Sequence, residues 1–273
     1  MILVRLRFGR SDGNKGQRDK LNEAAGSYLD ALRKNGQIYG DYLFAWSEGA
    51  LIAYSTVARP DAIAERHHSE WSMCALNSVV ELFGKRPELN VIDDDVPKRF
   101  ASWKRSTYLY LFTHLFDVSS PICCGDTGSP VPLYLLPTTQ ELREDLYFWA
   151  RRYADHDSIW LDSRALEIPA YKQLADPKSD LSIEGRELCT EVEQATGKPT
   201  FYYLHRYYGR RSGEATRPCP LCGSEWRASD ASIKNQPWHR FAFRCEPCRL
   251  VSQNAGAHDD ERRARIGEFK QER

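Results

Sequence analysis

The sequence predicts an α+β protein with a mixed α/β N-terminal domain and a small C-terminal ribbon, a β-hairpin that carries two cysteine knuckles. Two observations predict this class. Strand-like and helix-like periodicities alternate along most of the chain, and two C-x₂-C pairs follow them near the C-terminal end. A chain of 273 residues is long enough for one sizeable core and a small additional module.

The N-terminal part begins with an α/β pattern. Apolar and polar residues alternate in the strand-like runs, and apolar residues recur at helical spacing between them. The expected elements are a strand over 2–8, a helix over 18–34, strands over 39–46 and 50–57 joined by an S-E-G turn, and a helix over 70–83.

The middle of the chain is less regular. An acidic loop, V-I-D-D-D-V-P, is expected at 91–97, followed by a β-prone run over 107–116. After the loop S-S-P-I-C-C-G-D-T-G-S-P, the segment V-P-L-Y-L-L-P is expected to form a short strand, and its prolines favour the edge of a sheet.

Two helices and a strand are expected next. The first helix opens with T-T-Q-E-L, which is similar to a capping box, and places Leu142, Leu146, Trp149 and Tyr153 on one buried stripe. The second covers 179–196, has Ile183, Leu188 and Val192 as core candidates, and is stopped by G-K-P. A strand over 201–208 then leads to a polar linker, and we place the domain boundary near Gly209.

Composition indicates a folded protein, with 41% hydrophobic, 12% aromatic and 28% charged residues. The N-terminal sequence lacks the features of a signal peptide, and the most apolar run, over 108–116, is far shorter than a membrane helix requires. We therefore expect a cytoplasmic protein without a membrane partner. Because cytosolic thiols are kept reduced, the eight cysteines are expected to serve metal binding or catalysis in place of disulfides.

The four C-terminal cysteines form a metal-ligand pattern. Cys219 and Cys222 are matched by Cys245 and Cys248 across 22 intervening residues. Two such knuckles can direct four thiolates at one tetrahedral Zn²⁺ ion, and Gly223 suits the positive-φ turn of the first knuckle. A redox dithiol would come as a single pair. We expect one structural Zn²⁺ in a zinc ribbon over 209–252, between the α/β domain over 1–208 and a charged tail over 253–273.

The ribbon region is basic and aromatic. Residues 198–249 carry ten basic against four acidic residues, and four thiolates with one Zn²⁺ reduce the resulting charge of +6 to about +4. Strand alternation in W-H-R-F-A-F-R-C places His239, Phe241, Phe243 and Cys245 on a buried face and Trp238, Arg240, Ala242 and Arg244 on an exposed one. This mixture suits phosphates and bases. The candidate nucleic-acid contacts are Arg210, Arg211, Arg217, Arg227, Lys234, Trp238, Arg240, Arg244 and Arg249.

A purely structural interpretation of the same residues stays open. They could be ordinary solvated strand residues, with Trp226 and Trp238 filling a small core. Basic zinc ribbons also serve as protein-docking modules.

Other motifs are weaker candidates. The loop over 9–16 does not match a P-loop, which would have glycine in place of Asn14 and Ser or Thr in place of Gly16. Asp93, Asp94 and Asp95 could gather a divalent ion, but a solvated acidic loop is commoner. Adjacent histidines on a helix diverge by about 100°, so His67 and His68 with Glu65 and Glu70 form a poor ligand set. Cys123 and Cys124 are expected to be inert loop cysteines, and Cys74 and Cys189 core residues.

Three motifs in order carry a family resemblance: G-D-T-G-S-P-V-P-L-Y-L-L-P, then E-G-R-E-L-C-T-E-V-E-Q-A-T-G-K-P-T-F-Y-Y-L-H-R-Y-Y-G, and R-P-C-P-L-C-G-S-E-W. The chain resembles a bacterial family of unknown function described as zinc-ribbon-containing, candidate nucleic-acid-binding proteins. The resemblance spans most of 129–248. It implies Cys219, Cys222, Cys245 and Cys248 as zinc ligands and a cytoplasmic bacterial setting. That family pattern has a cysteine where this chain has Thr127, so it implies no second metal site here.

The sequence therefore predicts a non-enzymatic zinc-ribbon protein that contacts DNA or RNA through a basic, aromatic hairpin. The alternative is a protein-docking or inhibitory module, in which the acidic α/β domain binds a protein partner and the ribbon is purely structural. A third hypothesis is a metal-dependent nuclease that uses Asp93 to Asp95 or the region of His67 and His68.

Overall fold

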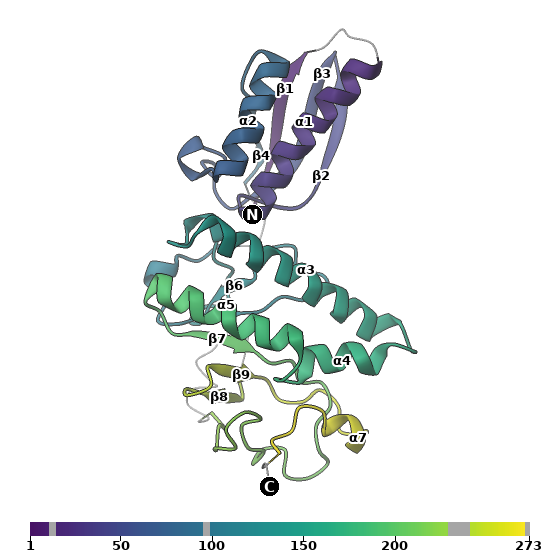
Figure 1. The fold of residues 1–273 in the computed structure, drawn as a ribbon, viewed down its shortest axis with the longest axis vertical. Helices are drawn as coiled ribbons and strands as arrows, with labels where there is room; N and C mark the ends of the chain where they lie inside the picture. The colour runs from purple at the N-terminus through teal and green to yellow at the C-terminus, as the bar shows by residue number, and fades with distance from the viewer. Residues whose placement is uncertain (11–14, 95–98, 229–240, 271–273) are drawn as a thin grey trace. The chain divides into compact units, whose positions relative to one another are not determined.

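The computed structural model describes residues 1–10, 15–94, 99–228 and 241–270 (Figure 1). The chain forms two compact units. Unit 1 comprises residues 1–100, 118–120 and 130–147, and unit 2 comprises residues 101–117, 121–129 and 148–273. The expected α+β class is confirmed, with helices, sheets and a four-cysteine cluster beside C-terminal strands. The division near residue 100 falls inside the range 1–208, and the ribbon over 209–252 lies in unit 2.

Unit 1 is an antiparallel sheet with two helices on one face (Figure 1). The strand order is β2-β3-β1-β4, and β1 pairs with both β3 and β4. Its elements are β1 (Ile2–Arg10), α1 (Lys15–Lys34), β2 (Ile38–Ser47), β3 (Ala50–Val57), α2 (Glu70–Phe83) and β4 (Glu88–Asp93).

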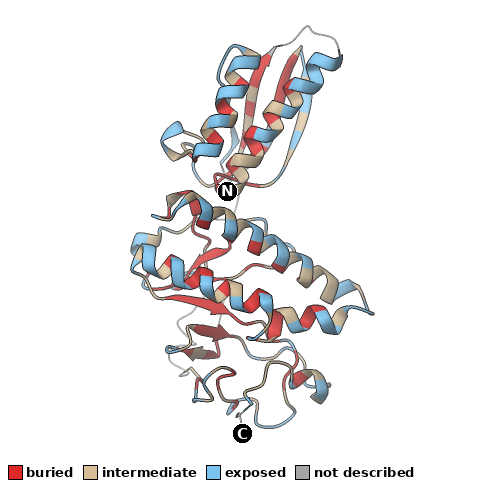
Figure 2. Ribbon diagram, in the orientation of Figure 1, coloured by how far each residue is buried: buried red, intermediate tan, exposed pale blue. Residues whose placement is uncertain are grey.

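The core of unit 1 follows from the two periodicities. Val4, Leu6 and Phe8 alternate along β1 and are fully buried, and they pack with the buried stripe of α1 that includes Leu29 and Leu32. Within this sheet, buried residues recur along β1 and β3 (Figure 2). The helix expected over 70–83 is confirmed as α2.

Two expectations for unit 1 are wrong. The acidic segment is partly a strand, because β4 extends through Asp93. The segment V-P-L-Y-L-L-P contains a 3₁₀ turn (Leu133–Leu135) in place of a strand, in which Leu135 N–H donates to the carbonyl oxygen of Pro132 (3.1 Å). A proline cannot donate to a strand ladder, whereas the turn buries Tyr134 in the core of unit 1.

Unit 2 contains a mixed five-stranded sheet in the order β6-β5-β7-β9-β8. β7 is parallel to both β5 and β9, while β5–β6 and β8–β9 are antiparallel. The strands are β5 (Leu109–Leu111), β6 (Ile122–Cys124), β7 (Thr200–Tyr203), β8 (Phe243–Cys245) and β9 (Leu250–Ser252), and its helices are α4 (Glu167–Ala175), α5 (Asp180–Thr196) and α7 (Glu261–Ala264). Helix α3 (Gln140–Asp162) begins in unit 1 and continues into unit 2.

The α3 stripe is confirmed, since Leu142, Leu146, Trp149 and Tyr153 are all at most 5% exposed. Thr139 Oγ1 accepts the Leu142 N–H (3.2 Å) and so caps this helix.

Helix α5 begins after Ser179, whose Oγ accepts the Ser182 N–H, and ends at Gly197 with a φ of 67°. Leu188 and Val192 are buried as expected, but Ile183 is 38% exposed. The buried side of the helix runs through Leu181, and Ile183 lies two residues further, about 200° around the helix axis.

Several local elements of unit 2 differ from the sequence-based expectations. β5 and β7 are shorter than the strands expected over 107–116 and 201–208. β6 lies in the expected Cys123–Cys124 loop, and α4 was not expected. The run over 107–116 leaves the sheet after Leu111, and Phe116 is 79% exposed. Among the helices that the structure describes, none combines the length and apolar character needed to cross a membrane.

Candidate metal centre

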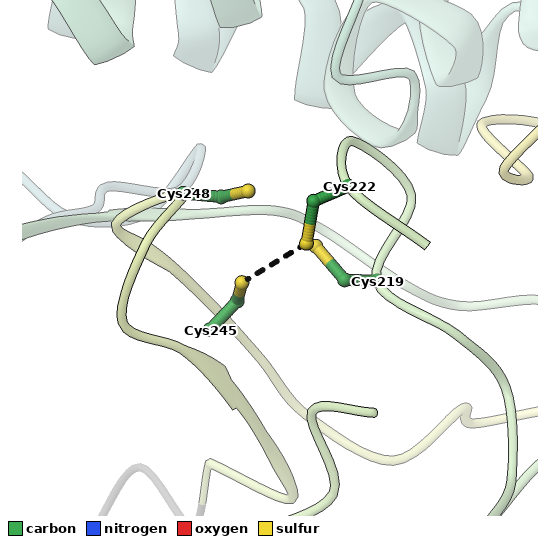
Figure 3. A group of neighbouring side chains, drawn as sticks. All are labelled: Cys219, Cys222, Cys245 and Cys248. Carbon is green, nitrogen blue, oxygen red and sulfur yellow. Dashed lines mark hydrogen bonds between the residues drawn. The ribbon is translucent and has the colours of Figure 1, made fainter. Parts of the chain in front are cut away.

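Four sulfur atoms converge in unit 2. The Sγ atoms of Cys219, Cys222, Cys245 and Cys248 all lie within 4.8 Å of one another, and the four side chains point toward a common centre (Figure 3). Cys222 Sγ and Cys245 Sγ, from different knuckles, are 3.7 Å apart. In residues 1–10, 15–94, 99–228 and 241–270, this is the one group of three or more His, Cys, Asp or Glu donors with such proximity.

The first knuckle is a tight loop closed by backbone hydrogen bonds. Gly223 N–H donates to the Cys219 carbonyl oxygen (2.9 Å), and Cys219 N–H donates to the Ser224 carbonyl oxygen (2.8 Å). Gly223 has a φ of 74°, which confirms the positive-φ turn expected from the sequence. A Cβ on Gly223 would also lie 2.7 Å from the Phe269 ring, so the C-terminal segment packs against this loop.

The second knuckle is the turn of the β8–β9 hairpin. Cys245 is the last residue of β8 and pairs with Leu250, so Cys248 lies in the connecting turn. Arg249 occupies the position equivalent to Gly223 and has a φ of 48°. This left-handed conformation costs a non-glycine residue roughly 1 kcal/mol, and both knuckles therefore use the same backbone geometry with different residues.

The donor set fits one zinc ion. Four Zn–S bonds of about 2.3 Å in a tetrahedron place neighbouring sulfurs about 3.8 Å apart, close to the 3.7 Å between Cys222 and Cys245. Four thiolates would fill a tetrahedral coordination shell, and such sites are structural. The structure thus brings together the four residues that the sequence selected, at positions that could hold one metal ion.

The protein environment treats the four thiols unequally. Hydrogen bonds from Ser224 lower the pKa of Cys222 to about 6, whereas burial raises the pKa of Cys245 to about 12 and also raises that of Cys248. A divalent cation among the sulfurs would oppose the effect of burial, since thiolates are its ligands.

The ribbon continues the main sheet of unit 2. Arg244 N–H donates to the Trp226 carbonyl oxygen (2.7 Å), and Ala228 N–H donates to that of Ala242 (2.9 Å), so residues 226–228 run beside β8. On the other side, β9 pairs in parallel with β7 through Tyr202 and Leu250. The four-cysteine cluster is therefore connected through β9 to β7, the strand at the centre of a five-stranded sheet.

Arg249 joins the ribbon to α5. Its Nε lies 3.0 Å from Glu193 Oε2 and its Nη2 lies 2.8 Å from Glu193 Oε1, a bidentate ion pair. Its Nη1 is 3.1 Å from Glu246 Oε2. Glu193 also accepts the Thr200 N–H (3.0 Å) at the start of β7. A residue expected to contact nucleic acid is thus engaged with two carboxylates of its own chain.

Arg217 is buried beside the first knuckle, with 2% of its side chain exposed. Its Nη2 donates to the Ala264 carbonyl oxygen (2.7 Å), and its Nη1 lies 3.5 Å from Glu214 Oε2. Burial lowers the pKa of its guanidinium to about 10, still well above neutral pH. Its carbonyl oxygen accepts the Trp226 indole N–H (2.9 Å), and Trp226 is 3% exposed, so this tryptophan fills the core.

The remaining described candidates differ in exposure. Arg210 Nε is 2.8 Å from Glu268 Oε1. Arg244 Nε is 2.6 Å from Glu246 Oε1, and its guanidinium lies over the Phe201 ring at 4.4 Å. Arg227 donates to Asn254 (2.7 Å) and covers the Phe243 ring at 5.0 Å. Arg211 is exposed, and its backbone N–H donates to Glu261.

The two-face assignment of the hairpin holds in part. Phe241, Phe243 and Cys245 are buried as expected. Ala242, expected to be exposed, is fully buried, and Arg244 is half-buried because the strand packs within a larger sheet. Lys234, Trp238, His239 and Arg240 lie outside the described residues.

The weaker candidate sites are separate from the cluster. Asp93 and Asp94 are exposed at the end of β4, and Asp95 lies outside the described residues. Cys123 and Cys124 are buried in β6, and Cys189 is buried in α5 as expected. Cys74 is exposed, so its assignment to the core is wrong.

The two histidines make different contacts in unit 1. His68 Nε2 is 2.9 Å from the Tyr28 hydroxyl, and His67 Nε2 is 3.7 Å from Asp61 Oδ2. His67 is the last residue of a 3₁₀ turn (Glu65–His67) and His68 follows it in an extended conformation, so the two rings contact different residues although the pair is not helical as expected.

Sequence reasoning missed Glu193 and Ser224. Glu193 fits the charge pattern of α5, and no local feature of the sequence indicated its partner Arg249, 56 residues away. Ser224 follows Gly223 directly, and its position after the second cysteine of a C-x₂-C-G turn could have indicated a hydrogen bond to the thiolate.

Comparison with known sequences gives a family without an assigned activity. Three family models match successive stretches, each described as a domain of unknown function: DUF8589 over residues 1–93, DUF2310 over 103–205 and DUF8594 over 209–257. An uncharacterized protein of Haemophilus influenzae is 37% identical over 232 residues, covering 82% of this chain and 87% of the relative. A second uncharacterized protein of the same organism is 37% identical over 144 residues, covering 52% of this chain and 68% of the relative.

These descriptions agree with the resemblance to a bacterial family of unknown function, and none of them names a zinc ribbon. The solved structure of Rv0793 from Mycobacterium tuberculosis is 18% identical and covers 35% of this chain and 98% of that chain, with a TM-score of 0.27. A likeness of this size carries no conclusion about function.

Proposed function

This chain belongs to the family of the uncharacterized Haemophilus influenzae protein, and we propose that it is a non-enzymatic zinc protein that binds a partner protein. In this proposal Cys219, Cys222, Cys245 and Cys248 hold one structural Zn²⁺ ion, and the ribbon braces unit 2. The observation that carries the proposal is the parallel pairing of β9 with β7, which makes the ribbon part of the unit's own sheet.

The ion pairs of the ribbon support a bracing role. Arg249 engages Glu193, Arg210 engages Glu268, and Arg217 is buried next to Glu214. A guanidinium paired with a carboxylate has little net charge to offer a phosphate, and counterion release is the main source of nucleic-acid affinity. Much of the basic character of the ribbon is thus used within the chain.

Exposed apolar side chains on unit 2 support a protein partner. Leu161 at the end of α3 and Leu166 before α4 are each 55% exposed, and Ile168 in α4 is 43% exposed. The three residues follow one another closely in the sequence, at the end of α3 and the start of α4, and we propose that they contribute to one protein-contact surface.

The docking proposal is tested by affinity capture with nuclease treatment, followed by binding of the purified partner. We expect one stoichiometric protein to survive nuclease, and the variant with Leu161→Ser and Leu166→Ser to lose at least ten-fold in affinity. Leu43→Ser in unit 1, where Leu43 is 72% exposed, is the matched control and should bind normally. Loss of capture upon nuclease treatment would contradict the proposal.

Nucleic-acid binding is the second candidate, and Arg227 favours it. Its guanidinium lies over the buried Phe243 ring at the ribbon, and Arg211 is a second, exposed basic residue of the same part of the chain. Binding should weaken steeply with salt, and Arg211→Ala with Arg227→Ala should lower affinity at least ten-fold, while Lys178→Ala should not. Undetectable binding to DNA and RNA at low salt would exclude this candidate.

A further inference from the structure

The four cysteines differ in their access to solvent. Cys219 is fully buried and Cys245 is 3% exposed, whereas Cys222 is exposed and Cys248 is intermediate. In the first knuckle, Cys222 is thus more accessible to a dissolved reagent than Cys219. Because all four ligands are cysteines, this difference in exposure favours reaction at Cys222 first.

Cys222, the exposed cysteine, has a buried partner across the site. Cys222 Sγ is 3.7 Å from Cys245 Sγ (Figure 3), and a disulfide requires the two atoms to approach to about 2.05 Å. Cys245 is the last residue of β8, where backbone pairing with β9 holds it. Cys222 lies outside the described strands, in the loop that Gly223 closes.

We propose that Cys222 and Cys245 form an oxidant-sensitive pair that converts the metal centre into a disulfide cross-link between the two knuckles. The inference rests on the proposed zinc site, because the four thiolates are held together as ligands of one ion. The co-reactant is a hydroperoxide, either hydrogen peroxide or an organic hydroperoxide.

The chemistry balances in two steps. The Cys222 thiolate attacks the distal oxygen of the hydroperoxide, the O–O bond breaks, and the departing alkoxide or hydroxide takes a proton, which leaves a sulfenic acid on Cys222. The Cys245 thiolate then attacks Cys222 Sγ, the S–S bond forms, and hydroxide leaves and is protonated to water. Two thiolates, one hydroperoxide and two protons thus give one disulfide, one alcohol or water, and one further water.

Oxidation leaves Cys219 and Cys248 as two of the four original ligands, and a structural zinc site needs all four. The backbone pairs that hold the ribbon, Arg244 with Trp226 and Tyr202 with Arg249, involve no sulfur. The ribbon therefore stays in the sheet after the metal is lost, and a dithiol reductant with added Zn²⁺ should restore the site.

The experiment uses the full-length zinc-loaded protein with hydrogen peroxide as the probe. Zinc content is measured first, then zinc release is followed with a chromogenic chelator while disulfides are mapped by non-reducing peptide mass spectrometry. We expect one zinc released per Cys222–Cys245 disulfide, and recovery of at least nine-tenths of the zinc after reduction. Cys74, an exposed thiol on α2, serves as the internal control and should gain a sulfenic acid label without zinc release.

The outcomes separate the two proposals. A purified protein without bound zinc would reject the proposed metal site itself. A zinc-loaded protein that first forms Cys219–Cys222 or Cys245–Cys248, or that keeps its zinc at a peroxide excess sufficient to label Cys74, would overturn the oxidant-sensitive pair while leaving the metal site intact. The Ser224→Ala variant keeps all four sulfurs and should yield the same disulfide, which checks that the cross-link depends on the sulfur positions.

Discussion

Arg249 and Glu193 form a bidentate ion pair between the second cysteine knuckle and α5, with Nε–Oε2 and Nη2–Oε1 distances of 3.0 and 2.8 Å. Arg249 reaches this carboxylate from a left-handed backbone conformation with a φ of 48°. The pair connects the turn that holds Cys248 to the helix that covers the sheet. Arg249 thus both follows the last cysteine of the second knuckle and connects that knuckle to α5 of unit 2.

This ion pair should contribute measurably to the stability of unit 2. The two side chains are 38% and 30% exposed, so solvent screening limits the coupling energy to about 1 kcal/mol despite the bidentate geometry. A double-mutant cycle with Arg249→Ala and Glu193→Gln, followed by urea unfolding, measures this coupling. A coupling energy indistinguishable from zero would mean that the contact adds nothing to stability.

Removal of one buried sulfur should abolish metal binding. Cys245→Ser is expected to reduce zinc from one ion per chain to none and to destabilise unit 2 by roughly 3 kcal/mol or more, because a structural zinc contributes directly to folding. Zinc is measured by atomic emission and unfolding by calorimetry. Cys74→Ser, at an exposed position of unit 1, is the matched control and should retain both zinc and stability.

Gly223 should tolerate no side chain. Gly223→Ala would place a Cβ in a residue with a φ of 74° and 2.7 Å from the Phe269 ring. We expect a loss of about 1 kcal/mol from the backbone conformation and a further loss of about 1 to 2 kcal/mol from overpacking.

Gly197→Ala provides the control for the Gly223 prediction. Gly197 has a φ of 67° and its Cβ would meet nothing within 4 Å, so only the backbone loss is expected. Adding Phe269→Ala to Gly223→Ala should remove the steric part while retaining its own packing loss. Equal unfolding free energies for Gly223→Ala and Gly197→Ala would show that the Phe269 contact is not restrictive.

His205 should make the protein sensitive to acid. Burial, with a smaller effect of Arg206, lowers its pKa from 6.5 to about 4. The unfolded chain therefore takes up a proton at this histidine before the folded chain does, so stability is retained above pH 6.5 and is lost as the pH falls toward 4. We expect a loss of about 2 kcal/mol by pH 5 from this group.

The His205 effect is measured by urea unfolding at pH 7.5 and pH 5. His205→Phe keeps an aromatic ring beside Trp160, whose ring centroid is 4.9 Å from that of His205, and removes the titrating group. The variant should therefore lose less stability between the two pH values than the parent protein. An unchanged pH dependence would assign the acid sensitivity to other groups.

Local signals accounted for many of the secondary-structure elements. The helix over 70–83, the stripe of Leu142 to Tyr153 and the Gly197 stop were predictable because capping residues and periodicity act within a few residues of the chain. The β-prone run over 107–116 was overextended because β propensity depends on neighbouring strands, and only Leu109–Leu111 finds partners. The 3₁₀ turn at Leu133–Leu135 shows the same dependence on tertiary packing.

The sequence by itself determined the candidate set of metal ligands, since the spacing and chemistry of Cys219, Cys222, Cys245 and Cys248 are local properties of two short turns. Only the tertiary structure decided how the ribbon is connected to the rest of unit 2. Parallel pairing of β9 with β7 and the contact of Arg249 with Glu193 join residues about fifty positions apart, and no local pattern encodes such pairings. Long-range packing therefore pairs Arg249, which the sequence assigns to a nucleic-acid partner, with the Glu193 carboxylate of the same chain.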